Sequence, residues 1–244
     1  MNRILLLKIA ILSFFGYSII GCAENKKKER SSTPPEVKIS GAMKNVMRKG
    51  QLQGTILLDT ISNKTGLYGL GPVAYLKGEI LVNNGNSYVA TVTSDTTMSV
   101  TKNSTISAPF FVYANATDWT TITVPDTIKN SKALEHFIDT ISTTYKRPFP
   151  FKLEGTVNNA TIHVQNLPDG TKVASRADAH KGQVTYPISN KAVTIVGFFS
   201  TEHQAVFTHH DSYVHMHLIT KDEKQMGHLD AIEIDALTLY VPKQ

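Results

Sequence analysis

The sequence contains very little cysteine, and this limits the chemistry available to the chain. Cys22 is the only cysteine among 244 residues, so no disulfide can form within the chain and no thiol remains elsewhere for catalysis. Long apolar runs are also lacking, because the apolar stretch over residues 9–20 is too short to span a bilayer as a mature helix. A disulfide-stapled fold and a catalytic cysteine in the rest of the chain are therefore excluded.

The sequence also lacks a strong charge of one sign. Twenty-five Lys and Arg residues stand against 20 Asp and Glu residues, which gives a net charge of +5. Part of that excess lies in the first 35 residues, and basic residues do not alternate with aromatic ones as in single-strand binders. We therefore expect no binding to nucleic acid.

The first residues have the pattern of an export signal. A basic start is followed by the apolar run 9–20 and by a small residue before Cys22, which predicts a signal peptide over residues 1–21. The sequence Ile-Ile-Gly-Cys at residues 19–22 resembles the lipobox of bacterial lipoproteins, and this resemblance implies cleavage before Cys22 and lipid attachment to its thiol. The alternative is an ordinary signal peptide that happens to contain a cysteine.

Residues 22–35 are predicted to form a tether between the lipid and a folded domain. They are polar and charged, they end in two prolines, and they show no apolar periodicity. Together with the lipidated Cys22, this segment predicts an extracytoplasmic protein held at a membrane surface.

The remaining residues, 36–244, are predicted to form a domain of the α+β class, with mostly antiparallel sheets and a few helices. Apolar residues at helical spacing predict helices over residues 36–49, 131–143 and 175–182. Apolar and β-branched runs predict strands over residues 54–60, 73–83, 87–92, 108–115, 151–155, 160–164, 192–200, 213–220 and 228–241.

Three short polar or glycine-rich stretches are predicted to be turns between these strands. The sequence NNGN at residues 83–86 is typical of a β-hairpin connection. The sequence GLYGLGP at residues 66–72 is interpreted as a glycine-rich turn, and Asn158-Asn159 as the turn between two strands.

Three histidines near the end of the chain form the main candidate site. Side chains alternate along a strand, so His215 and His217 project from one face. The polar stretch 221–227 suits a turn, and His228 then begins the partner strand within reach of the first two. Three protein ligands with an open fourth position are typical of catalytic zinc. Spacing alone leaves solvated strand histidines as an equal alternative, and His209 and His210 are expected to be solvated.

Glu79 is the carboxylate with the best claim to handle a proton beside such a metal. It lies in the apolar sequence YLKGEILV, so it belongs either to a site or to the wet face of a strand. Alternation places it with Lys77 and Leu81, which does not decide between these interpretations.

The chain resembles the α-acetolactate decarboxylases in several stretches. YVHMH at residues 213–217 and MGH at 226–228 are similar to the family's histidine motifs, and VTIVGF at 193–198 to its strand GTIVGF. LKGEI at residues 76–80 is similar to the family's LDGEL, and APFFVY at 108–113 to its SPFxxFTFF strand. The order and rough spacing agree over nearly all of the mature domain.

This resemblance implies a fold, an activity and a set of roles. It implies two related lobes, roughly 36–150 and 151–244, with the site between them, and commonly a homodimer. It implies that His215, His217 and His228 hold Zn²⁺, and that Glu79 orients or protonates a small-molecule substrate. The reaction implied is the decarboxylation of 2-acetolactate, or a related 2-hydroxy-3-keto acid, to acetoin.

Two residues depart from the family pattern on the side of the pocket that handles substrate. The family carries an arginine eight residues after a glycine, and this arginine is thought to meet the substrate carboxylate. Counted from Gly155, the same position holds His163. Histidine cannot form the bidentate fork of an arginine, although it can donate one hydrogen bond or add a fourth nitrogen near the metal. The family has a threonine directly after a GIG motif. That motif is similar to Gly69-Leu70-Gly71 here, and Pro72 takes the place of the threonine.

These observations leave two main hypotheses. The first is a zinc-dependent decarboxylase on a membrane-anchored lipoprotein, with Glu79 and His163 as its catalytic residues. The second is a lipoprotein that binds zinc or a small ligand without catalysis and keeps the fold and the metal site.

Overall fold

The computed structural model describes residues 34–244, which lie in one compact unit. The predicted signal peptide, the lipidated Cys22 and nearly all of the predicted tether lie outside the described residues. Within residues 34–244, no helix combines the length and the apolar character needed to cross a membrane.

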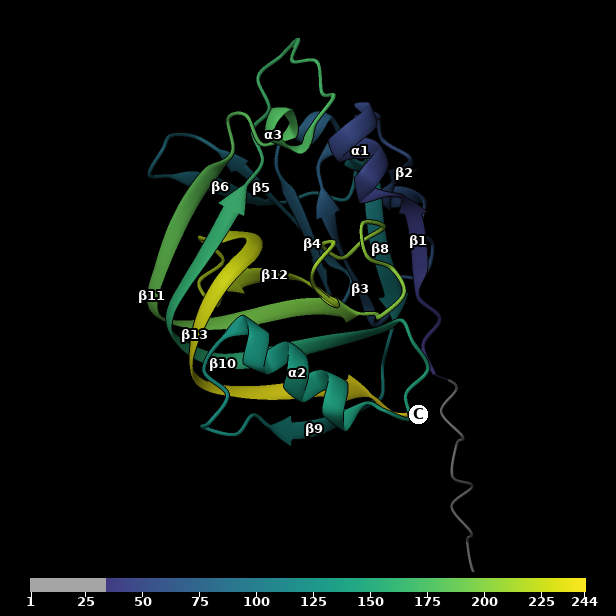
Figure 1. Cartoon of the computed structure of the whole chain (residues 1–244), viewed down its shortest axis with the longest axis vertical. Coiled ribbons are helices and arrows are strands. Elements are labelled where there is room, and N and C mark those ends of the chain that lie inside the picture. Colours follow the sequence, from purple (N-terminus) through teal and green to yellow (C-terminus); the bar gives the residue numbers. More distant parts are fainter. Residues whose placement is uncertain (1–33) are drawn as a thin grey trace, which may run out of the picture. The chain divides into compact units, whose positions relative to one another are not determined.

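The first of two large sheets is built from the first half of the chain (Figure 1). Its six strands are antiparallel and lie in the order β1-β8-β3-β4-β5-β6. Their bounds are β1 (Lys38–Gly41), β3 (Leu67–Pro72), β4 (Glu79–Asn83), β5 (Asn86–Val92), β6 (Met98–Lys102) and β8 (Phe110–Asn115). A separate pair is formed by β2 (Ile56–Leu57) and β7 (Ser107–Ala108).

The second large sheet contains the long strands of the chain, in the order β10-β11-β12-β13-β9. Its strands are β9 (Trp119–Thr123), β10 (Phe149–Val164), β11 (Val184–Phe199), β12 (Val214–Thr220) and β13 (Met226–Pro242). Because β13 pairs with β10 as well as with β12, the ladder from β10 through β13 closes on itself. This closure brings the start of β13 between β12 and β10.

The helices are few and short, which confirms the predicted fold class of mostly antiparallel sheets with a few helices. They are α1 (Met43–Lys49), α2 (Ser131–Ile141) and α3 (Arg176–Ala179), with two 3₁₀ turns, Leu58–Thr60 and Ala74–Leu76. The side chain of Asn130 caps α2 by accepting a hydrogen bond from the Ala133 N–H at 2.9 Å. The first predicted helix begins only at Met43, because residues 38–41 pair with β8 as a strand.

Three local predictions from the sequence are wrong. Residues 67–72 form strand β3 rather than a turn. Their glycines make room for an aromatic ring, since a Cβ on Gly69 would lie 2.6 Å from Cζ of Phe111. Asn158-Asn159 is no turn either: β10 runs through it, with register shifts around Asn159 that mark a bulge. Of the predicted strand 54–60, only Ile56–Leu57 is a strand.

The pairing of β9 affects the division into lobes. Trp119–Thr123 pairs with β13, so the second sheet already includes residues that precede 150. The boundary between the two sheets therefore falls between β8 and β9, earlier in the chain than the predicted lobe boundary near residue 150.

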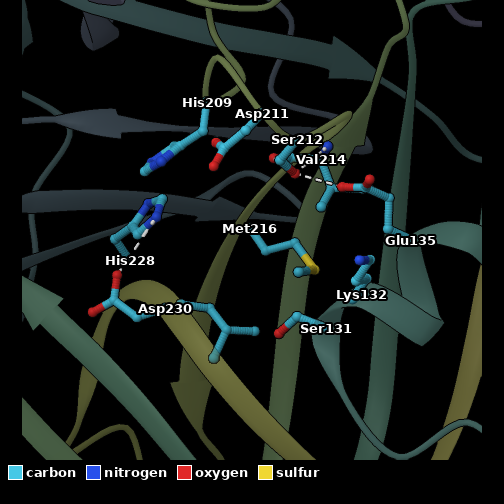
Figure 2. Close-up of a pocket in the computed structure, with 11 residues that line it drawn as sticks. Ser131, Lys132, Glu135, His209, Asp211, Ser212, Val214, Met216, His228 and Asp230 are labelled. Atoms are coloured by element: carbon cyan, nitrogen blue, oxygen red, sulfur yellow. Dashed lines mark hydrogen bonds and ion pairs between the residues drawn. The ribbon is translucent and has the colours of Figure 1, made fainter.

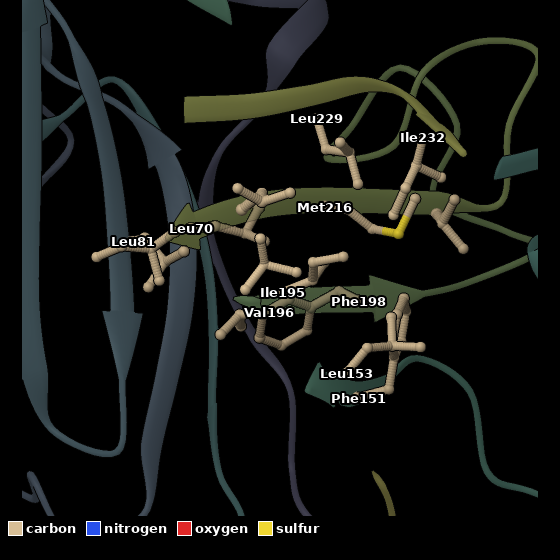
Figure 3. Close-up of a cluster of buried hydrophobic side chains, with 14 of the residues drawn as sticks. Leu70, Leu81, Phe151, Leu153, Ile195, Val196, Phe198, Met216, Leu229 and Ile232 are labelled. Carbon is tan, nitrogen blue, oxygen red and sulfur yellow. The ribbon is translucent and has the colours of Figure 1, made fainter. Parts of the chain in front are cut away.

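The main hydrophobic core joins the two sheets. Leu70 and Leu81 from the first sheet belong to the same buried cluster as Ile195 and Val196 from the second (Figure 3). A second cluster, with Met43, Met47 and Phe110, packs α1 against α3 and the first sheet. The candidate site lies where this cluster meets the second sheet, because these three side chains also line its cavity.

Candidate metal centre

The three predicted histidines converge on adjacent strands of the second sheet. His215 and His217 lie on β12 and are buried on one face, while Met216 between them packs in the main core. His217 is the direct antiparallel partner of His228 on β13. The structure therefore brings together the three residues that the sequence predicts as metal ligands.

A fourth histidine extends this row across the sheet. His228 pairs with His163 on β10 as well as with His217, and the rings of His163 and His228 lie 4.6 Å apart. Gly227 permits this close approach, because a Cβ there would lie 2.4 Å from the carbonyl oxygen of His163. A glycine before His228 is thus needed to lay β13 against β10.

The buried ring nitrogens have the character of metal ligands. One nitrogen from each of His215, His217 and His228 lies within 4.8 Å of the others. His215 Nε2 and His228 Nδ1 are 3.1 Å apart; two nitrogens on one tetrahedral zinc ion lie about 3.3 Å apart. Both ring nitrogens of His217 and Nδ1 of His215 are buried and have no hydrogen-bond partner among the described residues.

Burial also keeps these rings neutral. Loss of solvent lowers the pKa of His217 to about 3, and the nearby His163 ring adds to the effect. Burial likewise places the pKa of His215 and of His228 well below the usual value, with neighbouring histidines contributing. A neutral imidazole offers one lone pair, so one nitrogen of each of the three rings can bind a divalent zinc ion.

Glu79 approaches the histidines from the first sheet. It is the first residue of β4 and is 3% exposed, so it does not lie on a wet face. Its Oε2 is 3.6 Å from Nε2 of His217. Burial raises the pKa of Glu79 well above the usual value and the Asp230 carboxylate raises it further, while a backbone hydrogen bond from Gln165 opposes the shift. A carboxyl whose pKa is raised in this way is suited to hold and donate a proton beside the three histidines.

Asp230 links His163 to the metal centre. Its Oδ1 accepts a hydrogen bond from Nδ1 of His163 at 2.7 Å and lies 3.9 Å from Nε2 of His228. The other nitrogen of His163 is 3.5 Å from Nε2 of Gln165. Since a carboxylate only accepts, Nδ1 of His163 carries the proton of this hydrogen bond.

Two adjoining cavities reach the centre. A small one of about 30 Å³ is lined by the side chains Met43, Met47, Pro72, Glu79, Phe110, His163, Gln165, Arg176, His180, His209, His215 and His228. A larger one of about 420 Å³ lies on the side of α2, between Lys132 and Glu135 of that helix and the strands with Met216 and Asp230 (Figure 2). His209 and His228 line both, so the larger cavity leads towards the metal centre.

Comparison with known proteins identifies the family. The family model described as α-acetolactate decarboxylase matches residues 40–244. The chain belongs to the α-acetolactate decarboxylase family. The resemblance noted in the sequence motifs is thereby confirmed over the whole described domain. No curated protein matches the chain.

Solved structures show the fold of the α-acetolactate decarboxylases. The α-acetolactate decarboxylase of Bacillus subtilis strain 168 superposes with a TM-score of 0.71 at 20% identity, covering 85% of each chain. A Staphylococcus aureus protein of unknown function, similar to α-acetolactate decarboxylase, gives 0.69 at 18% identity and covers 84% of each chain. At these identities the likeness establishes the fold of the domain.

Some cavity residues of this α-acetolactate decarboxylase family member were missed by the sequence analysis. His209, predicted to be solvated, is half-buried and stacks on His228 with ring centroids 5.1 Å apart, so that prediction is wrong. His210 is exposed, as predicted. Arg176 and Asp230 also reach the cavities. No spacing pattern marks these residues, because the loop before β12, the packing of α3 against α1 and the pairing of β13 with β10 bring them in.

Asp230→Asn is expected to weaken zinc binding without unfolding the domain. The carboxylate holds His163 and faces the outer nitrogen of His228, and loss of such a partner typically costs about 10- to 100-fold in metal affinity. Competition with a chelator measures this affinity. Asp235→Asn is the matched control. Asp235 is an exposed aspartate on the same strand, and its carboxylate accepts a hydrogen bond from the hydroxyl of Thr156 on β10. Equal zinc affinity in the Asp230 variant and the wild type would contradict the assignment.

Proposed function

We propose that this chain is a zinc-dependent decarboxylase that converts 2-acetolactate, or a closely related 2-hydroxy-3-keto acid, to acetoin. The observation that carries the proposal is the position of the buried Glu79 carboxyl, whose pKa burial raises, at 3.6 Å from His217 within a cluster of three buried histidines. Metal-assisted decarboxylation calls for a metal-ligand set and a proton donor: Glu79, His215 and His228 line one cavity, and His217 lies next to Glu79.

The three histidines would hold the zinc ion. His215 and His217 would bind it from β12 and His228 from β13. When bound, zinc supplies a Lewis acid that stabilises negative charge developing on substrate oxygen. His163 lies next to His228 and, through Asp230, supports the ligand rather than the ion itself.

Glu79 would manage the proton. Breaking the bond between C2 and the carboxylate releases CO₂ and leaves the bonding electron pair in an enediolate. The protonated carboxyl of Glu79 then donates its proton to C2, which yields acetoin, and the resulting carboxylate regains a proton from water. Because burial favours the neutral acid, Glu79 returns to its proton-loaded form after each turnover.

The direct test uses purified protein lacking residues 1–22. Zinc-loaded protein incubated with 2-acetolactate should form acetoin well above the uncatalysed rate, and removal of zinc with a chelator should abolish the excess. Zinc bound at about one ion per chain without any excess acetoin would contradict catalysis and favour a binding protein with the same centre.

We also propose that the protein is a membrane-anchored lipoprotein outside the cytoplasm. The support is the order of basic start, apolar run, small residue and Cys22 in the sequence. Cys22→Ser is expected to shift the protein from the membrane fraction to the soluble fraction, because the thiol that carries the lipid is lost. Fractionation of cells that express each form measures this, with Ser31→Ala in the tether as the control; an unchanged membrane fraction for Cys22→Ser would refute the anchor.

A further inference from the structure

The position where the family resemblance implies an arginine holds His163 here, and this histidine is already engaged. Nδ1 of His163 donates a hydrogen bond to Oδ1 of Asp230 at 2.7 Å. Its Nε2 lies 3.5 Å from the amide nitrogen of Gln165. A carboxylate placed against His163 would lie beside the Asp230 carboxylate, so this side of the cavity suits a second carboxylate poorly.

A different arginine reaches the same cavity from another element. Arg176 is the first residue of α3 and lines the small cavity together with Glu79, His163, His215 and His228. It is the one Lys or Arg side chain among the described residues that line this cavity. The helix holds it in place, because Ala179 is buried in the cluster that packs α3 against α1.

The charge of Arg176 is not neutralised by a carboxylate. Among residues 34–244, no Asp or Glu oxygen lies within 4.0 Å of its guanidinium, whose Nη1 contacts Nδ1 of the exposed His210 at 3.3 Å. The charge also reaches the rings around the cavity. The pKa of His209 is lowered most by burial and next by Arg176. The pKa of His180 is lowered most by burial, then by His163 and then by Arg176.

We propose that Arg176 binds the carboxylate of the substrate and takes over the contact that the family makes through an arginine at the position of His163. The inference rests on the proposed function and assigns the substrate class, a small 2-hydroxy carboxylic acid. A guanidinium offers two parallel N–H donors that match a carboxylate. Held there, the carboxylate lies in the same cavity as Glu79, which supplies the proton to the carbon that loses CO₂.

The test measures binding of 2-hydroxy-2-methylpropanoate, which has the hydroxy acid group but no keto group and so does not decarboxylate. Calorimetry with zinc-loaded protein should give a Kd that is raised about 10- to 100-fold by Arg176→Gln, the range for loss of a charge-assisted pair. Arg176→Lys should retain part of the affinity, and wild-type binding should weaken with salt. Arg48→Gln is the matched control, because Arg48 lines the neighbouring surface pocket with Arg176 but not the cavity.

The outcomes separate this inference from the proposed function. Equal affinity in wild type and Arg176→Gln, or no binding by zinc-loaded wild type, would overturn the role of Arg176. Binding that depends on Arg176 without turnover of acetolactate would refute the decarboxylase and keep the carboxylate site. With acetolactate as substrate, Arg176→Gln should raise KM far more than it lowers kcat, since the contact exists before the bond breaks. If Arg176→Gln fails to fold, the affinity of Arg176→Lys and the salt dependence of wild-type binding test the role of Arg176 instead.

Discussion

His217→Ala is expected to empty the metal centre. His217 is fully buried, both of its ring nitrogens lack a hydrogen-bond partner among the described residues, and it lies directly opposite His228 in the β-ladder. Without it only two of three ligands remain, which is fewer than catalytic zinc sites use. Zinc content measured on purified protein should fall from about one ion per chain to a small fraction of that.

The control for this loss is another histidine of the same chain. His136 is exposed on α2, so His136→Ala removes an imidazole without touching the centre and should leave the zinc content unchanged. Circular dichroism of both variants checks that the sheets persist. Wild-type zinc content in His217→Ala would show that the three histidines are not the ligand set.

Glu79→Gln is expected to lower kcat by about 10²- to 10⁴-fold, the usual contribution of general acid catalysis. Burial raises the pKa of Glu79 and so favours its neutral form, which glutamine resembles in shape and charge while lacking the acidic proton. Stability and zinc content should therefore change little. Steady-state kinetics of acetoin formation and metal analysis on the same preparation separate the two effects.

Glu233→Gln provides the matched comparison. Glu233 is an exposed glutamate on β13 that accepts a hydrogen bond from the Asn159 amide at 2.8 Å, so the same chemical change is made away from the cavity. Its kcat should equal that of the wild type. Full activity in Glu79→Gln would exclude Glu79 as the proton donor.

The sequence predicted the histidine side of the site well and its surroundings poorly. Strand alternation is local, so it placed His215 and His217 on one face, and the polar turn brought His228 opposite them. Glu79 was undecided, because its burial depends on how β4 meets the second sheet and not on its neighbours in sequence. Arg176 reaches the cavity only through the packing of α3 against α1, which no sequence pattern reports.

The wrong predictions of local structure have a common cause. Glycine and asparagine were interpreted as turn formers, but tertiary contacts decide their use. In residues 67–72 the glycines accommodate the ring of Phe111, and at Asn159 a bulge takes up the irregularity while β10 stays paired on both sides. The fold class was predictable because the alternation of apolar residues along the strands survives such local exceptions.

The optical activity of the acetoin produced reports whether Glu79 donates the proton to a single face of the intermediate. If Glu79, fixed at the start of β4, delivers the proton to one face of the enediolate, the zinc-loaded protein must form a single enantiomer of acetoin from 2-acetolactate. Circular dichroism of the product solution should therefore show a signal that grows with turnover. Racemic acetoin formed no faster than in buffer, from protein that holds zinc at His215, His217 and His228, would contradict the account.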